Sequence, residues 1–367
     1  MTTFRAPGRV NLIGEHTDYN AGFVMPAAIN LSAYTSITRR EGRKLQIRSA
    51  NFEDQIEVDL DDATLKAHGH WSDYPIGVAV TLERAGYRLR GAHLEIKSEV
   101  PMGSGLSSSA AVEVSVACAL VANSELVVDR KELAQLCQKA ENEFVGARVG
   151  IMDPFVALFG EERKALMLDC RSLEYKLVPV PENVRLVVCN TMVKHALASG
   201  AYNERRAECE AGVKHLARYL PHVKALRDVT LEDLEQYGHE LPEVIYRRCR
   251  HVISENARVR AASDALEQHD LYRFGQLMTE SHFSLRYDYE VSSRQLNVMV
   301  ALAVNVDGVY GARMTGGGFG GCTVNLVDAE LVDNFTRIVA EGYEQITRLK
   351  PDIYVCEASR GAEQITS

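Results

Sequence analysis

Apolar and polar positions in the first half of the chain predict strands mixed with helices. Residues 45–49 and 93–100 are strand-like, and the second run alternates through His-Leu-Glu-Ile-Lys. Residues 107–122 are nearly all small or apolar, which predicts a helix buried on most sides. Asp129, followed three positions later by Glu132, is a capping-box-like start for the next helix.

The second half is dominated by charged segments with helical character. A strand-like run at 184–189 follows a proline-rich stretch, so we place a boundary there and predict domains at 1–178 and 179–367. Helices are predicted at 203–220, 231–238, 242–266 and 271–285, and strands at 322–327 and 353–356. We allow the last strand to return to the first domain. The pattern as a whole predicts an α+β protein whose two domains enclose a cleft.

Composition excludes several classes of protein. With 367 residues, 46% hydrophobic and 25% charged, the chain resembles an ordinary globular protein and not a disordered one or a coiled-coil rod. A net charge of −9 argues against nucleic acid or an anionic membrane as a general partner. No run approaches the ~20 apolar residues of a membrane helix. Eight cysteines without a C-x-x-C pair predict buried thiols in a cytoplasmic protein, without a disulfide framework or zinc site.

The first segment with candidate chemistry is Arg-Ala-Pro-Gly-Arg-Val-Asn-Leu-Ile-Gly-Glu-His-Thr-Asp-Tyr-Asn at residues 5–20. Glu15, His16 and Asp18 place hydrogen-bonding groups within four positions. Carboxylates accept directional, charge-assisted hydrogen bonds, so the cluster suits a polyhydroxylated ligand. The alternative is an acidic turn in which Asp18 and Asn20 cap backbone groups.

The second segment is Pro-Met-Gly-Ser-Gly-Leu-Ser-Ser-Ser-Ala-Ala at residues 101–111, where glycines open directly into a helix. Backbone N–H groups and the helix dipole at such a junction favour a phosphate, and one serine hydroxyl can bind Mg²⁺. The segment is not a Walker A loop, and Ser108 replaces the third glycine of the dinucleotide fingerprint. The alternative is a serine N-cap after a glycine turn.

The third segment is Met-Thr-Gly-Gly-Gly-Phe-Gly-Gly-Cys-Thr-Val-Asn-Leu at residues 314–326. Its glycines satisfy G-x-G-x-x-G, but strand-like residues follow where that fingerprint needs a helix, so we reject a nicotinamide site. We expect the glycines to permit a close backbone approach to a ligand or to another loop. A tight turn between strands is the alternative.

Together and in this order, the three segments resemble the galactokinase branch of the GHMP sugar and metabolite kinases. Residues 8–20 match its signature G-R-V-N-L-I-G-E-H-T-D-Y-N, and the other two match its phosphate loop and C-terminal glycine loop. The resemblance implies an N-terminal domain like domain 2 of ribosomal protein S5, a ferredoxin-like C-terminal domain, and an active site in the cleft between them. It also implies that MgATP phosphorylates the anomeric hydroxyl of α-D-galactose, with a monomer as the expected state.

By position in those motifs, the resemblance implies a role for each matching residue. Asp153 would be the catalytic base, and Arg9 would stabilise the transition state and influence that carboxylate. The sugar contacts would be Glu15, His16, Thr17, Asp18, Gly150 and Tyr202. The ATP contacts would be Gly103, Ser104, Gly105, Leu106, Ser107, Ser108 and Ser109, with looser matches at Ser49 and Trp71. The Mg²⁺ ligands would be Ser109 and Glu141.

Some alternatives stay open at this stage. Pro154 stands where the family usually has Gln, and a proline there fits the start of a helix with Asp153 as a structural N-cap. Glu141 as a surface carboxylate and Tyr202 as a core residue are further alternatives. At the level of function, the rivals are a related kinase for N-acetylgalactosamine, galacturonate or arabinose, and a non-catalytic galactose-sensing regulator. The intact serine string and Asp153 argue against the regulator.

Overall fold

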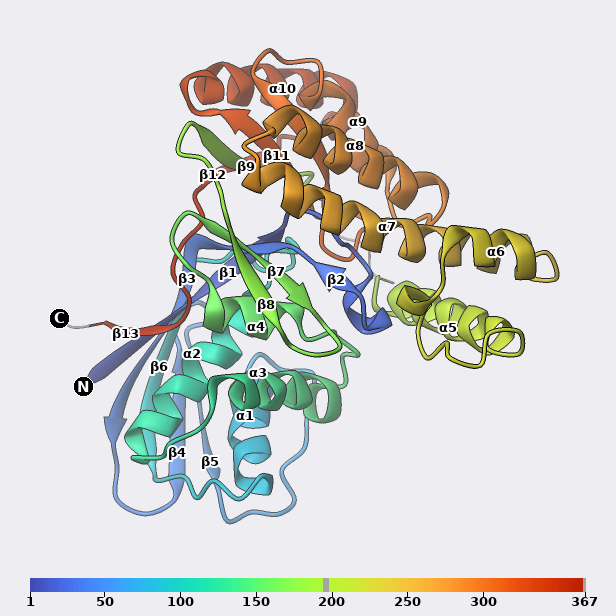
Figure 1. The fold of residues 1–367 in the computed structure, drawn as a ribbon. Helices are drawn as coiled ribbons and strands as arrows, with labels where there is room; N and C mark the ends of the chain where they lie inside the picture. Colours follow the sequence, from blue (N-terminus) through green and yellow to red (C-terminus); the bar gives the residue numbers. More distant parts are fainter. Residues whose placement is uncertain (194–197, 366–367) are drawn as a thin grey trace.

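The lower part of the molecule in Figure 1 is built on a six-stranded sheet. The computed structural model describes residues 1–193 and 198–365. All neighbouring strands of this sheet are antiparallel except the parallel pair β4–β6. Their order is β13 (Glu363–Ile365), β1 (Thr2–Asn11), β3 (Pro26–Arg39), β6 (Ala92–Ser98), β4 (Lys44–Ser49) and β5 (Asp54–Asp59).

Helix α2 is the centre of the helical layer that packs against this sheet. It contacts β1 and β3 on one side and the other three helices of the layer on the other, and its Ala110, Ala111, Val114 and Ala117 are fully buried. A helix that is apolar all round is buried all round, as its sequence predicts. The layer comprises α1 (Asp73–Arg84), α2 (Ser108–Asn123), α3 (Arg130–Lys139), which continues as a π-helical turn (Ala140–Val145), and α4 (Met152–Phe159).

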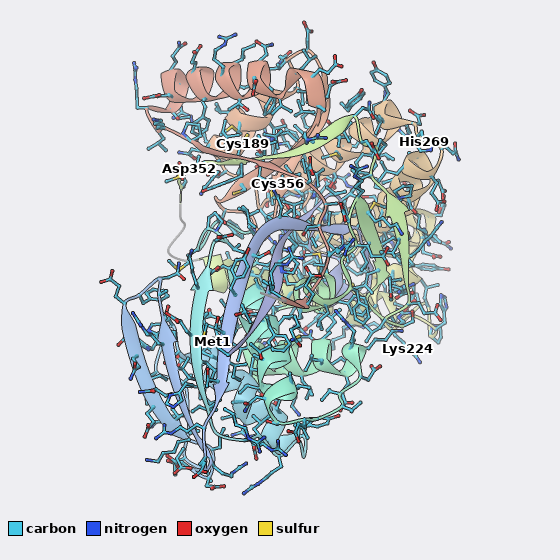
Figure 2. The ribbon with its side chains drawn as sticks, turned by 90° about the vertical axis from the view of Figure 1, so that its left-hand side faces the viewer. Met1, Cys189, Lys224, His269, Asp352 and Cys356 are labelled. Atoms are coloured by element: carbon cyan, nitrogen blue, oxygen red, sulfur yellow. The ribbon has the colours of Figure 1, made fainter. Side chains whose placement is uncertain are left out.

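The upper part of the molecule is an antiparallel four-stranded sheet with its own helices (Figure 1). The strand order is β10 (Val309–Thr315), β11 (Cys322–Asp328), β9 (Val184–Asn190) and β12 (Asp352–Cys356). The helices are α7 (Glu243–Glu267), α8 (Leu271–Tyr287), α9 (Arg294–Ala303) and α10 (Val332–Thr347), with α5 (Ala198–Leu216) and α6 (Leu231–Tyr237) to one side. Figure 2 shows Cys189 and Cys356 in this upper sheet and Met1 at the lower one.

Two features join the upper and lower parts. A three-stranded sheet of β2 (Phe23–Val24), β7 (Lys164–Asp169) and β8 (Tyr175–Pro179) lies between them. One continuous apolar cluster contains Val10 and Ala111 from below together with Leu186, Phe274 and Val324 from above. Because a shared core resists relative displacement, the groups facing the junction are held in fixed positions.

The predicted α+β architecture is confirmed, and the division at residue 178 stays a prediction. After β12 the chain crosses back, and β13 pairs with β1 of the lower sheet. All eight cysteines are free thiols, and six of them are buried. Among the described residues, no helix combines the length and apolar character that crossing a bilayer requires.

Candidate active site

Two neighbouring cavities meet at the side chains of Arg9 and Asp153. The larger has a volume of about 420 Å³, and the smaller has about 170 Å³. Arg9, Val149 and Asp153 line both. A group bound in one cavity therefore faces a group bound in the other across this arginine and this aspartate.

Arg9 holds Asp153 through a two-pronged ion pair. Arg9 Nε donates to Asp153 Oδ1 at 2.8 Å, and Arg9 Nη2 donates to Oδ2 at 2.6 Å. The third guanidinium nitrogen, Nη1, donates to the Gly105 carbonyl at 2.5 Å, which ties the pair to the phosphate loop. The Ser107 hydroxyl also donates to Asp153 Oδ2. Parallel charge-assisted bonds fix the plane of the carboxylate as well as its position.

The interpretation of Asp153 as a helix N-cap is wrong. Helix α4 begins at Met152 with Ile151 as its N-cap residue, so Asp153 lies inside the first turn. Its carboxylate accepts from Arg9 and Ser107 and caps no N–H group of its own helix. Pro154 follows in the same turn, where a missing N–H costs nothing because first-turn N–H groups have no intrahelical partner.

The phosphate loop presents its glycines and serines to the larger cavity at the N-terminus of α2. Gly103, Gly105 and Ser107 have φ angles of +68°, +81° and +60°. These left-handed residues turn the chain sharply into α2, whose N-terminus carries the positive end of the helix dipole. The loop residues on its wall are Gly103, Gly105, Ser107, Ser108 and Ser109.

The remaining two residues of the predicted cradle line neither cavity. Ser104 Oγ donates to the Pro101 carbonyl at 2.7 Å, and the Leu106 side chain is fully buried. The alternative of a serine N-cap is correct in position, since Ser107 is the N-cap residue of α2, but its side chain forms no capping hydrogen bond with that helix. Its hydroxyl bonds to Asp153 instead.

Two buried carboxyl groups lie behind the serines. Glu141 lines the larger cavity, and burial together with the charge of Asp153 raises its pKa to about 7. Glu113, one helical turn after Ser109, is fully buried, and burial next to Glu141 raises its pKa well above the usual range. Neither acid forms an ion pair with a described residue, so a bound cation would stabilise both.

This pair of acids fits Mg²⁺ better than a closed protein metal site. Within residues 1–193 and 198–365, no cluster of three or more His, Cys, Asp or Glu side chains could hold a metal ion. Mg²⁺ is typically bound by one or two carboxylates together with substrate phosphates. Ser109 and Glu141, both on the cavity wall, can supply the protein's share of such a site. The sequence reasoning missed Glu113, although a lone acid in an apolar helix was a visible signal.

Aromatic side chains form the far wall of the larger cavity. Trp71 and Ser49, the looser matches for ATP contacts, line this cavity, and Phe52 stacks on Trp71 with a centroid distance of 5.9 Å. Trp71 Nε1 donates to Asp54 Oδ2 at 3.0 Å, which fixes the indole ring. A purine base could pack on such a surface. The sequence reasoning missed the lining residues Asn51, Phe52, Tyr74 and Ser98, which stand outside the three glycine-rich or polar segments, and Met102, which lies inside the second segment.

The smaller cavity collects nearly all of the predicted sugar contacts. It is lined by Glu15, His16, Asp18, Gly150 and Tyr202, with Met152, Gly316 and Gly317 completing the wall. Because Tyr202 lines this cavity, the alternative that it is only a core residue is wrong. Thr17 lies outside the cavity, because its hydroxyl donates to the Gly14 and Phe23 carbonyls at 2.7 and 2.6 Å.

The position of the Asp18 carboxylate depends on the glycine at position 150. Burial and the neighbouring charge of Asp153 raise the pKa of Asp18 to about 6. A Cβ atom at position 150 would overlap Asp18 Oδ2, so only glycine leaves this carboxylate in place. The result is an acceptor in the smaller cavity whose charge changes near pH 6.

Glu15 connects this cavity to the upper sheet. Its Oε2 accepts from Arg313 Nη1 at 2.8 Å and from the Asn11 amide, and Oε1 accepts from the Gly316 N–H at 2.7 Å and Thr315 Oγ1 at 3.1 Å. Burial raises the pKa of Glu15, and Arg313 opposes that shift. The carboxylate thus holds the third glycine-rich segment against the first.

The third segment is the loop between the antiparallel strands β10 and β11. A Cβ at Gly316 would lie 3.2 Å from the Gly105 carbonyl oxygen, and one at Gly321 would lie 3.0 Å from that of Ser104. Both residues have positive φ angles, +84° and +77°. The strand-to-strand turn and the close approach to another loop are therefore both present.

Comparisons with known proteins point to one family over nearly the whole chain. Family models described as "Galactokinase galactose-binding signature", "GHMP kinases N terminal domain" and "GHMP kinases C terminal" match residues 2–39, 73–161 and 262–345. A galactokinase of Roseiflexus sp. is 46% identical over 361 residues, covering 98% of this chain and 92% of the relative. A galactokinase of Chloroflexus aggregans is 48% identical over 357 residues, covering 97% and 92%.

Solved structures give the same result. The crystal structure of Lactococcus lactis galactokinase complexed with galactose superposes with a TM-score of 0.96 at 40% identity, covering 99% of this chain and 95% of that one. The Methanococcus jannaschii mevalonate kinase shares the fold, with a TM-score of 0.68 at 17% identity and 98% of both chains covered.

Proposed function

Because this chain belongs to the galactokinase family of the GHMP kinases, we propose that it transfers the γ-phosphoryl group of ATP to the C1 hydroxyl of α-D-galactose. The products are galactose 1-phosphate and ADP. The observation that carries the proposal is the junction of two cavities at Arg9 and Asp153. ATP occupies the larger cavity and the sugar the smaller, so that acceptor and donor meet at this pair.

Asp153 acts on the acceptor hydroxyl. Phosphoryl transfer requires little covalent work from a protein, so catalysis is mainly positioning and charge stabilisation. One Asp153 oxygen accepts the C1 hydroxyl proton or orients it while the sugar oxygen bonds to the γ-phosphorus and the bond to the β-phosphate oxygen breaks. The bonds from Arg9 and Ser107 hold the carboxylate in one orientation for this step.

Arg9 and the phosphate loop stabilise the charge that moves with the phosphoryl group. The guanidinium lines both cavities and is anchored on the Gly105 carbonyl, so it faces the reacting phosphoryl group from a fixed position. The N-terminus of α2 adds backbone N–H donors on the phosphate side. Such preorganised groups cost no rearrangement during the reaction.

Ser109 and Glu141 would hold the Mg²⁺ ion of MgATP. There it would supply positive charge that offsets the negative charge of the ATP phosphates. The buried Glu113 beside Glu141 supports this assignment, because two adjacent acids without an ion-pair partner among the described residues suit a cation. We also propose a cytoplasmic location, which the eight free thiols favour, and a monomeric state.

The sugar is identified by a panel assay for sugar-dependent ADP release. Galactose, N-acetylgalactosamine, galacturonate and arabinose are each supplied with MgATP. We expect galactose to give the highest kcat/KM. A higher value for another sugar would identify the related kinase, and galactose binding without ADP release would identify the non-catalytic regulator.

A further inference from the structure

We propose that Tyr19 is a positioning residue that makes the His16 imidazole a hydrogen-bond donor, through Nε2–H, to a hydroxyl oxygen of the bound sugar. The inference rests on the proposed function for the identity of the ligand. It adds which ring nitrogen carries the proton and which residues determine this.

A buried chain of hydrogen bonds ends on His16. His16 Nδ1 and Tyr19 Oη lie 2.8 Å apart, Tyr19 Oη and Tyr289 Oη 2.8 Å apart, and Tyr289 Oη and Cys209 Sγ 3.2 Å apart. Tyr289 and Cys209 are almost completely buried. The hydroxyls of Tyr19 and Tyr289 and the thiol of Cys209 each have a single hydrogen to donate. These hydrogens must therefore all point the same way along the chain of hydrogen bonds.

Acceptor strength selects the direction. If the hydrogens point toward His16, the last acceptor is the lone pair of an imidazole nitrogen. If they point the other way, the last acceptor is the thiol sulfur of Cys209, which accepts weakly. Burial lowers the pKa of His16 to about 3, so the ring is neutral and carries one proton. Because Nδ1 accepts from Tyr19, that proton is on Nε2.

The His16 ring borders the smaller cavity, and its Nε2 atom is buried. His16 lines that cavity, and its Nε2 has no hydrogen-bond partner of ordinary geometry among the described residues, although the residue is only 5% exposed. The backbone of Gly317, also on the wall, contacts the ring and opposes the lowering of its pKa. A buried N–H whose partner has poor geometry is costly, and a sugar oxygen would provide a better acceptor.

Packing keeps the ring from turning over. The centroid of His16 lies 5.4 Å from that of Tyr202 and 4.8 Å from that of Tyr289, and Tyr19 packs edge-on against Tyr202 at 5.0 Å. Tyr289 is itself fixed by His251, whose ring lies 4.5 Å away. Residues on α5 and α7 and just after α8 thus determine the hydrogen-bonding state of a side chain in the N-terminal motif.

The direct test is the ¹⁵N NMR spectrum of the His16 ring in the full-length protein without sugar. We expect the Nδ1 shift of an unprotonated acceptor and the Nε2 shift of an N–H donor. A proton on Nδ1 would overturn the proposal. Because no ligand is present, this result does not depend on whether the protein phosphorylates galactose.

The second test replaces the hydroxyl of Tyr19 but keeps its ring. In Tyr19→Phe we expect the ring shifts to move toward a mixture of tautomers, and the KM for galactose to rise about 3- to 10-fold, as for the loss of one hydrogen bond, with kcat within about twofold. The matched control is Tyr343→Phe, which removes a buried hydroxyl that donates to the Thr191 carbonyl at 2.9 Å and lines neither cavity. A Tyr19→Phe variant that behaves like this control would also overturn the proposal.

Discussion

Arg9 and Asp153 lie 144 positions apart in the sequence, yet they form a two-pronged ion pair with N–O distances of 2.8 and 2.6 Å. The pair forms the wall shared by the two cavities. A carboxylate held in this way cannot rotate freely, so an acceptor hydroxyl that approaches from the smaller cavity meets it in a single orientation.

Aspartate 18 predicts how sugar affinity depends on pH. Its pKa is raised to about 6, so the carboxylate is ionised above pH 6 and becomes protonated as the pH falls below that value. The protonated form loses acceptor capacity, so the KM for galactose should rise below pH 6 and approach a tenfold increase per pH unit. Initial rates between pH 5 and 8 measure this. In Asp18→Asn the KM should be high and nearly independent of pH, and a wild-type-like profile in that variant would contradict the assignment.

Trp71 gives a direct signal for the nucleotide because it is the only tryptophan in the chain. We expect ATP to change its fluorescence and galactose alone to leave it nearly unchanged. In Trp71→Ala the KM for ATP should rise about 5-fold or more, since stacking on a base is worth about 1–3 kcal/mol, while the KM for galactose stays constant. A larger effect on galactose than on ATP would place the nucleotide elsewhere.

Glutamate 141 predicts the metal requirement. The substitution Glu141→Ala should raise the Mg²⁺ concentration for half-maximal activity by about tenfold or more. Removing even an indirect metal contact commonly costs 10–100-fold in metal affinity. The matched control is Glu143→Ala on the same π-helical turn, because the Glu143 side chain is 59% exposed. Titrating Mg²⁺ at fixed ATP compares the two variants. Equal requirements would remove Glu141 from the metal site.

Glutamate 15 predicts a loss of stability as well as of function. Glu15→Ala leaves Arg313 buried, with 0% side-chain exposure, and without its anionic partner. Breaking a buried pair from one side costs about 3–5 kcal/mol of unfolding free energy. Urea denaturation should show this loss, whereas Glu341→Ala, which breaks a pair whose two side chains are 60% exposed, should cost no more than about 1 kcal/mol. If both variants lose equally little, Glu15 does not hold the glycine loop.

Local signals in the sequence were strong enough to predict some elements and too weak for others. The apolar run at 107–122 and the cap at Asp129 correspond to α2 and to the start of α3, where the Asp129 carboxylate accepts from the N–H groups of Lys131 and Glu132. Strand β1 was not predicted, because most of its residues are buried on both faces and their pattern does not alternate. Helix α5 begins at Ala198, before the predicted start at residue 203, because its first turn lacks a capping pattern.

The candidate site shows even more clearly that local sequence patterns do not predict contacts between distant segments. The glycines and serines at residues 101–111 predict a phosphate loop without help from any other segment, since few other structures require that string. The pairing of Arg9 with Asp153 depends on how β1 and α4 pack. No local pattern in the sequence encodes a contact between residues that are 144 positions apart. Only the resemblance to a family predicts that these two residues act together. Phe52 was missed because an aromatic residue in a loop carries no local signal for stacking on Trp71.

The central claim is that Asp153 activates the galactose C1 hydroxyl toward ATP. The most direct measurement is ³¹P NMR of the products formed from galactose and MgATP by the wild-type chain and by Asp153→Asn. We predict galactose 1-phosphate and ADP from the wild type, and formation slower by at least about 100-fold in the variant with galactose affinity retained. Phosphate on another hydroxyl, or near-normal turnover by Asp153→Asn, would contradict the account.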